Sequence, residues 1–189
     1  EFTTLTESSA QIIDANSPTI TSATVGGGTK KIGDVITITV AADAAAYTLS
    51  SGTMNGVNLA GFNDGGGGSY TMTYTVASGN TDRAAGQTPI SIVLTDAAGN
   101  TNTAFATLTE SAGLSIDANA PSISSATVSG GTAKIGTVIT VTIAADAAGY
   151  SLGSGTMNGV NLAGFADNGG GSYTATYTVA SGNTDRAAG

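Results

Sequence analysis

The chain contains no cysteine, no histidine and no tryptophan among its 189 residues. Without cysteine there is no disulfide or thiol chemistry, and without histidine the commonest general base and metal ligand is missing. Zinc and iron–sulfur sites therefore lack their usual ligands, whereas a hard cation that binds oxygen still has candidates. Five basic residues stand against 13 acidic ones, and this net charge of −8 argues against a nucleic-acid partner.

Long apolar runs are missing as well. No segment approaches the roughly 20 apolar residues of a membrane span, so we expect no membrane insertion. No Asp or Glu stands in an apolar setting that would raise its pKa for acid–base catalysis. We therefore expect no enzymatic activity and no organic cofactor.

What the chain does contain is a long tandem repeat. Residues 2–86 align with residues 105–189 at an offset of 103 without a gap, and 19 of the 85 aligned positions differ. This period is too long for a solenoid unit and suits an independent β-sandwich domain. The predicted fold class is all-β: tandem Ig-like antiparallel β-sandwiches, the second lacking its last strands in this chain.

The repeat predicts an organisation in four parts: the end of a preceding repeat plus a linker (1–16), a complete Ig-like repeat (17–112), a linker (113–119) and a second, C-terminally incomplete repeat (120–189). The second copy has no counterpart of residues 87–110, so a core face and a sheet edge should be exposed. Two interpretations stay open: the chain continues beyond this sequence, or another copy supplies the strands by donor-strand pairing.

Alternation of apolar and polar residues predicts the strands of the first repeat. The expected ranges are Thr19–Val25, Asp34–Ala41, Tyr47–Leu49, Gly56–Phe62, Ser69–Ala77, Pro89–Thr95 and Thr103–Thr109. In the first of them, strict alternation places Ile20 on the face opposite Ala23 and Val25. The tyrosines expected to be core residues are Tyr70, Tyr74, Tyr173 and Tyr177.

The remaining candidate chemistry lies in carboxylates and amides. An Ig-like strand order gathers them at the two ends of a domain, and a joint between repeats would collect several. The candidate metal ligands are Asp14, Asn16, Asp43, Asp82, Asp96, Asn100, Glu110, Asp117, Asn119 and Asp146. Such oxygens suit Ca²⁺. The alternative is that these are turn residues whose side chains bond their own backbone.

Four motifs carry a family resemblance: Asp-Ala-Asn-(Ser/Ala)-Pro, Lys-Ile-Gly-x-Val-Ile-Thr, Ser-Gly-Asn-Thr-Asp-Arg-Ala-Ala-Gly and Leu-Thr-Asp-Ala-Ala-Gly-Asn-Thr. In this order the chain resembles the tandem bacterial Ig-like domains of giant surface adhesins, the biofilm-associated and RTX-type repeat proteins. The resemblance implies a non-enzymatic stalk on the bacterial cell surface, extracellular, projecting a distal binding module. It implies neighbouring repeats as partners and Ca²⁺ at the joints, with Asp14 and Asp117 in the linkers and Asp96 with Asn100 in the turn as ligands.

Two other functions stay open. A carbohydrate- or surface-binding module would use exposed aromatics such as Tyr47 and Tyr150, or a flat threonine array such as Thr71, Thr73 and Thr75. A filament subunit would pair with other copies through the open second repeat.

Overall fold

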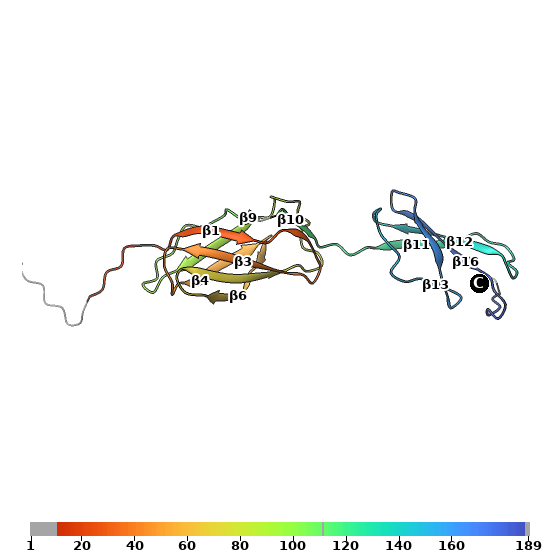
Figure 1. Ribbon diagram of the computed structural model, residues 1–189, viewed down its shortest axis with the longest axis horizontal. Coiled ribbons are helices and arrows are strands. Elements are labelled where there is room, and N and C mark those ends of the chain that lie inside the picture. The colour runs from red at the N-terminus through yellow and green to blue at the C-terminus, as the bar shows by residue number, and fades with distance from the viewer. Residues whose placement is uncertain (1–10, 111, 188–189) are drawn as a thin grey trace, which may run out of the picture. The chain divides into compact units, whose positions relative to one another are not determined.

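The computed structural model describes residues 11–110 and 112–187, which form two compact units with a boundary between Asn119 and Ala120. Every regular element in this described part is a β-strand, and the all-β fold class is confirmed (Figure 1). Those residues accordingly include no helix able to cross a membrane. The part of the predicted preceding repeat at residues 1–10 lies outside the described residues.

The first unit is a sandwich of two sheets with an added parallel strand pair; the sheets are antiparallel except for one edge strand of the larger sheet, which pairs in parallel. The larger sheet has the order β6-β7-β3-β1-β9, with β1 at Ile20–Val25, β3 at Val35–Ala42, β6 at Ala60–Asp64, β7 at Ser69–Thr75 and β9 at Thr109–Glu110. The smaller sheet has the order β5-β4-β8, with β4 at Thr48–Met54, β5 at Val57–Asn58 and β8 at Ile90–Thr95. The pair consists of β2 at Gly28–Lys31 and β10 at Leu114–Asp117.

One core fills the space between the sheets of the first unit. On β3 the buried residues are Ile36, Ile38 and Val40, and they alternate with exposed threonines. β7 alternates in the same way, and Met72 on its buried face lies opposite Ile38. These burial patterns confirm the predicted alternation for both strands. Burial of the apolar face is the main stabilising term of such a sheet.

The first strand departs from strict alternation. Ile20, Ala23 and Val25 are all buried, although the sequence predicted Ile20 on the opposite face. The reason is a register shift in the pairing of β1 with β3 between Ile20 and Ser22. Such a bulge places one extra residue in the strand and turns both apolar ends toward the core.

The predicted strand at Thr103–Thr109 is wrong for most of its length. Of these residues, only Phe105 bridges to Ile92 of β8, with both N–H···O distances at 3.0 Å, and β9 begins at Thr109. The side chain of Asn102 accepts from the N–H of Leu94 at 2.6 Å and donates to the carbonyl of Ile92 at 3.2 Å. A side chain thus takes bonds that a regular ladder would use.

The predicted linker at 113–119 is also wrong, because its central residues form β10. β10 pairs in parallel with β2, from Leu114 opposite Gly28 to Asp117 opposite Lys31. Leu114 and Ile116 are buried in the core of the first unit. The segment therefore completes the first sandwich instead of separating two domains.

The second unit repeats the larger sheet. It has the order β11-β12-β16-β15, with β11 at Ile123–Val128, β12 at Val138–Ala145, β15 at Ala163–Asp167 and β16 at Ser172–Thr178. A two-residue hairpin, β13 at Thr156–Met157 and β14 at Val160–Asn161, replaces the smaller sheet. No strand follows β16 in the described residues up to 187. The core is correspondingly small and centres on Val141, Ile143 and Tyr173.

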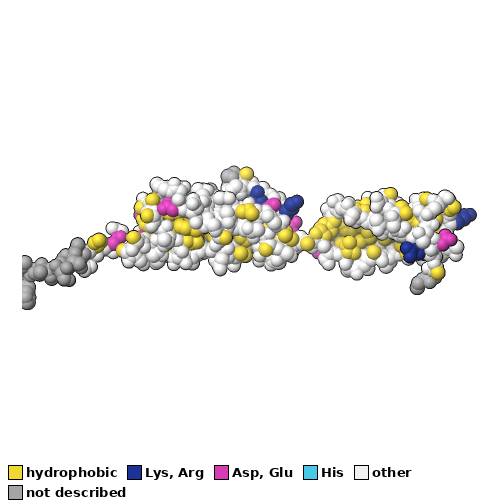
Figure 2. All heavy atoms as spheres, turned by 90° about the horizontal axis from the view of Figure 1, so that it is seen from below, with side chains coloured by type: hydrophobic (Ala, Val, Ile, Leu, Met, Phe, Trp, Pro, Cys, Tyr) yellow, Lys and Arg dark blue, Asp and Glu magenta, His cyan; other side chains and the backbone are white. Residues whose placement is uncertain are grey.

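The expected exposure of a core face is confirmed in the second unit. Ile123 is 65% exposed and Val128 47%, whereas their counterparts Ile20 and Val25 are 8% and 4% exposed. Figure 2 shows the corresponding broad hydrophobic area on the surface of the second unit. The sheet that covers this face in the first unit has no equivalent among the described residues of the second.

Candidate functional site

At the end of the first unit where its chain enters, the turn after β8 is organised by Asp96. Its Oδ1 accepts hydrogen bonds from the N–H groups of Ala98 at 2.9 Å and Asn100 at 2.8 Å. Its Oδ2 accepts from Asn100 Nδ2 at 3.0 Å, and the same nitrogen donates to the carbonyl of Asp14 at 3.3 Å. The structure thus brings together three of the predicted ligands, Asp14, Asp96 and Asn100. Asp14 also accepts from the N–H of Asn16 at 3.0 Å.

Asp43 fixes the start of β1. Its Oδ1 accepts from the N–H of Thr19 at 2.9 Å and from the hydroxyl of Tyr47 at 3.0 Å. The Thr19 bond is the main reason why the pKa of Asp43 lies below its usual range, against the opposing effect of desolvation. Desolvation, and secondly the bond to Asp43, raises the pKa of Tyr47. Asp43 therefore stays ionised at neutral pH and acts as a backbone acceptor.

Asp96 has a lowered pKa for a related reason. Desolvation acts to raise it, but the hydrogen bonds from the Asn100 side chain and from the N–H groups of Asn100, Ala98 and Gly99 together outweigh that effect. The pattern of donors is that of an Asx turn, in which the side chain satisfies the backbone two to four residues ahead.

At the other end of the first unit, Asp82 holds the chain as it leaves. Its Oδ1 accepts from the N–H of Ala118 at 2.7 Å, and its Oδ2 accepts from Asn119 Nδ2 at 2.6 Å. The N–H of Asn119 donates to Asp117 Oδ1 at 3.2 Å. Asp82, Asp117 and Asn119 therefore lie together, as a hydrogen-bonded group within the first unit.

Glu110 and Asp146 accept hydrogen bonds from other backbone groups. Glu110 Oε2 accepts from the N–H groups of Gly86 at 2.9 Å and Leu114 at 2.8 Å, within the first unit. Asp146 belongs to the second unit, where its Oδ1 accepts from the N–H of Ser122 at 3.0 Å. That bond is the main cause of the lowered pKa of Asp146. Asp146 repeats the role of Asp43 at an offset of 103 residues.

The described residues contain no group of three or more Asp, Glu, His or Cys side chains placed to hold a metal ion. The carboxylates at both ends of the first unit instead accept hydrogen bonds from backbone and amide N–H donors. Because Ca²⁺ takes six to eight oxygen ligands, a calcium ion at either end would need carbonyl or water oxygens for most of its coordination.

A buried polar network in the first unit was not predicted from the sequence. Asn55 is 5% exposed and has a positive φ of 54°. Its Nδ2 donates to the carbonyl of Thr81 at 2.7 Å and to the hydroxyl of Tyr74 at 3.3 Å, and its Oδ1 accepts from Arg83 Nε at 2.7 Å. The Tyr74 hydroxyl donates to Asn80 Oδ1 at 2.8 Å. The network ties the β4–β5 turn to the loop that carries Asp82.

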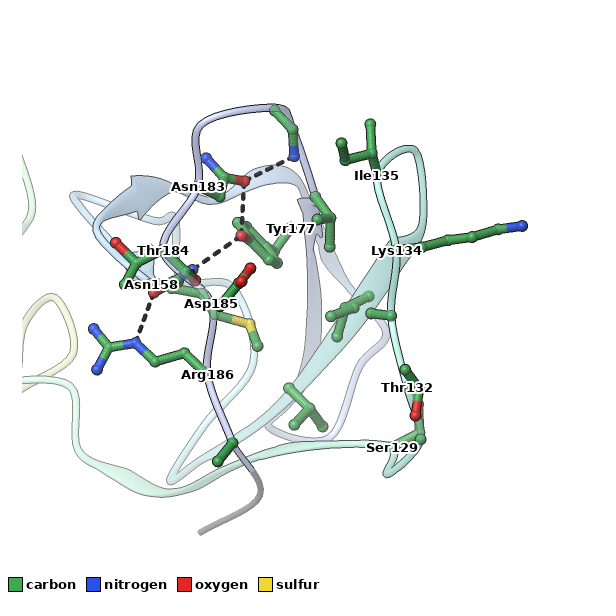
Figure 3. Close-up of a pocket in the computed structure, with 18 of the residues that line it drawn as sticks. Ser129, Thr132, Lys134, Ile135, Asn158, Tyr177, Asn183, Thr184, Asp185 and Arg186 are labelled. Atoms are coloured by element: carbon green, nitrogen blue, oxygen red, sulfur yellow. Dashed lines mark hydrogen bonds between the residues drawn. The ribbon is translucent and has the colours of Figure 1, made fainter.

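The second unit repeats this network through Asn158. Its Nδ2 donates to the hydroxyl of Tyr177 at 3.3 Å and to the carbonyl of Thr184 at 2.8 Å, and its Oδ1 accepts from Arg186 Nε at 2.9 Å. Tyr177 donates to Asn183 at 2.8 Å (Figure 3). All the side chains of this network are identical in the two repeats, and this identity is the sequence signal that could have revealed the network.

The aromatic residues give little support to a sugar-binding surface. Tyr47 and Tyr150 are half-buried and stack on Tyr70 and Tyr173, with ring centroids 6.2 Å and 6.3 Å apart. Stacking of this kind serves packing. The predicted burial of the four core tyrosines is confirmed.

No protein-family model matches the chain, and no curated protein matches it. Among solved structures, the titin domains Z1Z2 in complex with telethonin match 89% of this chain and 84% of theirs, at 12% identity and a TM-score of 0.33. A chimeric titin Z1Z2 carrying a peptide from decorin matches 88% of this chain and 84% of its own, at 12% identity and a TM-score of 0.32.

Proposed function

We propose that the chain is an extender segment of a bacterial cell-surface adhesin, in which tandem Ig-like repeats hold a distal binding module away from the cell. The proposal rests on the 103-residue repeat and on the motifs that resemble adhesin stalks. The side-chain bonding supports a structural role, since the acidic residues at the unit ends bond to the protein's own backbone.

The observation that carries the proposal is the anchoring of the connection between β10 and β11. Asp82 holds Ala118 and Asn119 on the side of the first unit, and Asp146 holds Ser122 on the side of the second. In this fully described connection, only Ala120 and Pro121 have no such bond.

Proline fixes its own φ and restricts the residue before it. The freedom of the two unanchored residues is therefore small. A repeat whose connections are held in this way is suited to spacing and stiffness, which are the properties that a stalk requires.

Calcium at this joint stays a prediction. Asp82 and Asp117 have exposed carboxylates that each accept a hydrogen bond from Asn119, and these would be the first ligands to test. Binding to the joint would replace the hydrogen bonds that Asp82 now accepts.

The proposal predicts a narrow distribution of distances between the units. Spin labels on cysteines introduced at Thr75 and Thr178, two exposed positions of a chain without native cysteine, report that distribution by pulsed electron paramagnetic resonance. The double variant Asp82→Ala with Pro121→Gly should broaden the distribution at least about twofold, because the connection then behaves as a flexible linker.

The matched control is Asp64→Ala, which removes an acceptor for the N–H of Ala46 away from the connection and should leave the width unchanged. The same measurement in EGTA and in millimolar Ca²⁺ distinguishes stiffness due to the Asp82 bonds and Pro121 from stiffness due to a bound calcium ion. Calcium stiffening predicts narrowing only with the ion. A wild-type distribution as broad as that of the double variant, with and without Ca²⁺, would rule out a stiff joint.

A further inference from the structure

The second unit has an open groove where the first unit has a strand. This groove has a volume of about 1040 Å³ and is formed entirely by residues of the second unit. One wall is the segment 129–135 and the other is the segment 183–186, which lie on opposite sides of the pocket in Figure 3. Tyr177, Ile139 and Met157 form part of its lining.

The first unit shows what fills the equivalent space. There β10 lies between β2 and the loop that carries Asp82 and Arg83. Ile116 exchanges two backbone hydrogen bonds with Arg83, at 2.9 Å and 2.8 Å, and its side chain is 3% exposed. Ala118 donates its N–H to Asp82. The strand is thus held by backbone pairing on one side, by a bridge on the other, and by burial of its apolar residues.

Both walls of this space recur in the second unit. At an offset of 103 residues, β2 corresponds to residues 131–134, and Asp82 and Arg83 correspond to Asp185 and Arg186. Residues 131–134 form no strand in the second unit, although Thr132 and Lys134 are kept from β2. A β-strand needs a partner for its backbone groups, and no strand among the described residues pairs with residues 131–134.

The chain also carries a second copy of the missing strand near its start. Residues 11–16 are the counterparts of 114–119, and Ile13, Asp14, Ala15 and Asn16 match without change. In this structure Ile12 and Ile13 are each 84% exposed, whereas Ile116, the counterpart of Ile13, is 3% exposed. The segment therefore has the sequence of a core strand, but its two isoleucines are exposed in this structure.

We propose that residues 11–16 of one copy dock in the groove of the second unit of another copy, as an added parallel strand. The register follows from the first unit: Gln11 lies opposite Gly131 and Asp14 lies opposite Lys134, with Ile13 bridging to Arg186. Ala15 and Asn16 then donate to Asp185, as Ala118 and Asn119 donate to Asp82. Strand addition of this kind gains affinity from backbone pairing and specificity from alternate side chains.

Charge and geometry favour this occupant. In the proposed register Asp14 faces Lys134, which repeats the opposition of Asp117 and Lys31 in the first unit. Repetition of one heterologous contact links copies head to tail, so the product is a chain of molecules. Gln11 takes the place of Leu114, so Ile13 is the main apolar anchor and the assembly should be reversible. A smaller neighbouring groove, of about 290 Å³ between β11, β12 and β13, is left open.

The test is the concentration dependence of association for the full chain, by sedimentation velocity. The wild type should associate reversibly, and Ile13→Asp should weaken association at least about tenfold because a charge then enters an apolar groove. The matched control is Ile12→Asp. Ile12 is equally exposed, but its counterpart Ser115 is only half-buried on β10 and bonds to a neighbouring hydroxyl, so association should change less than about twofold.

Asp185→Ala tests the acceptor side and should also weaken association, since it removes the acceptor for Ala15 and Asn16. A spin label on Ser17→Cys of one copy should broaden the amide signals of residues 131–134 in a second, isotope-labelled copy. A wild type that stays monomeric into the millimolar range would overturn the proposal. Equal weakening by both isoleucine variants, or broadening at other residues, would also overturn it, because each indicates unspecific apolar association.

Discussion

Replacement of Asn55 by alanine is expected to lower the free energy of unfolding of the first unit by about 3 kcal/mol. The side chain makes three hydrogen bonds, to Thr81, Tyr74 and Arg83, in a position that is 5% exposed. Alanine leaves these partners without their bonds and also has to adopt the left-handed backbone conformation, which costs an alanine about 1 kcal/mol. Urea unfolding, read from amide signals assigned to each unit, measures the change.

Two comparison variants separate the causes. Asn55→Gly removes the same bonds but suits the positive φ, so it should be about 1 kcal/mol less damaging than alanine. Asn158→Ala removes the equivalent bonds in the second unit and meets the same backbone cost, because Asn158 has a φ of 52°. Its side chain is half-buried and water can replace the lost bonds, so the loss of stability should be about 1 kcal/mol smaller than at Asn55. Equal losses of unfolding free energy at Asn55 and Asn158 would contradict the claim that burial of the Asn55 side chain strengthens its contribution.

Gly68→Ala is expected to destabilise the first unit by about 3 kcal/mol or more. Gly68 has a φ of +80°, and a Cβ on it would collide with the carbonyl oxygen of Ala42. Gly68 also accepts a hydrogen bond from the N–H of Ala42 at 2.8 Å, so the turn cannot move away without losing a bond at the end of β3. The same unfolding experiment measures the loss.

The neighbouring glycine provides the control. Gly67 has a φ of +59° but open space around a Cβ, so Gly67→Ala should cost only the backbone term of about 1 kcal/mol. Gly171 in the second unit repeats the geometry of Gly68 against Ala145, and Gly171→Ala should destabilise that unit in the same way. Similar losses at Gly67 and Gly68 would show that close packing against β3 is not the cause.

The strands that could be predicted are those in which burial alternates along the chain. On β3 and β7 the apolar residues stand at every second position, and a residue in such a strand has one side in the core. β10 was missed because its residues were assigned to a linker, although Leu114 and Ile116 alternate along it. β2 was missed for the opposite reason. The residues Gly28–Lys31 show no alternation of apolar and polar side chains. They form a strand only because they pair in parallel with β10, and each residue lies opposite the one 86 positions later in the sequence.

Side-chain hydrogen bonds account for the other differences. Asn102 lies just before the strand expected at Thr103–Thr109, and its side chain bonds to the backbone of Leu94 and Ile92. The alternation of apolar and polar residues does not reveal such bonds. Asn55 precedes Gly56 and so resembles an ordinary hairpin turn. The carboxylates were recognised as candidates from residue type, but their donors, such as Thr19 for Asp43 and Ala118 for Asp82, are distant in sequence.

The extender proposal and the docking proposal can fail separately. A stiff connection depends on Asp82, Asp146 and Pro121, whereas head-to-tail docking depends on Ile13 and the groove beside Asp185. A molecule can therefore be a stiff spacer and remain monomeric, or associate through flexible joints.

The most direct test of the extender proposal measures the length of arrays that contain two, four and eight of the 103-residue repeats. Small-angle X-ray scattering, with Ile13→Asp in every array to prevent association, gives the maximum dimension of each. A stiff stalk predicts a dimension that grows in proportion to the number of repeats. Growth with roughly the square root of that number, as for a flexible chain, would contradict it.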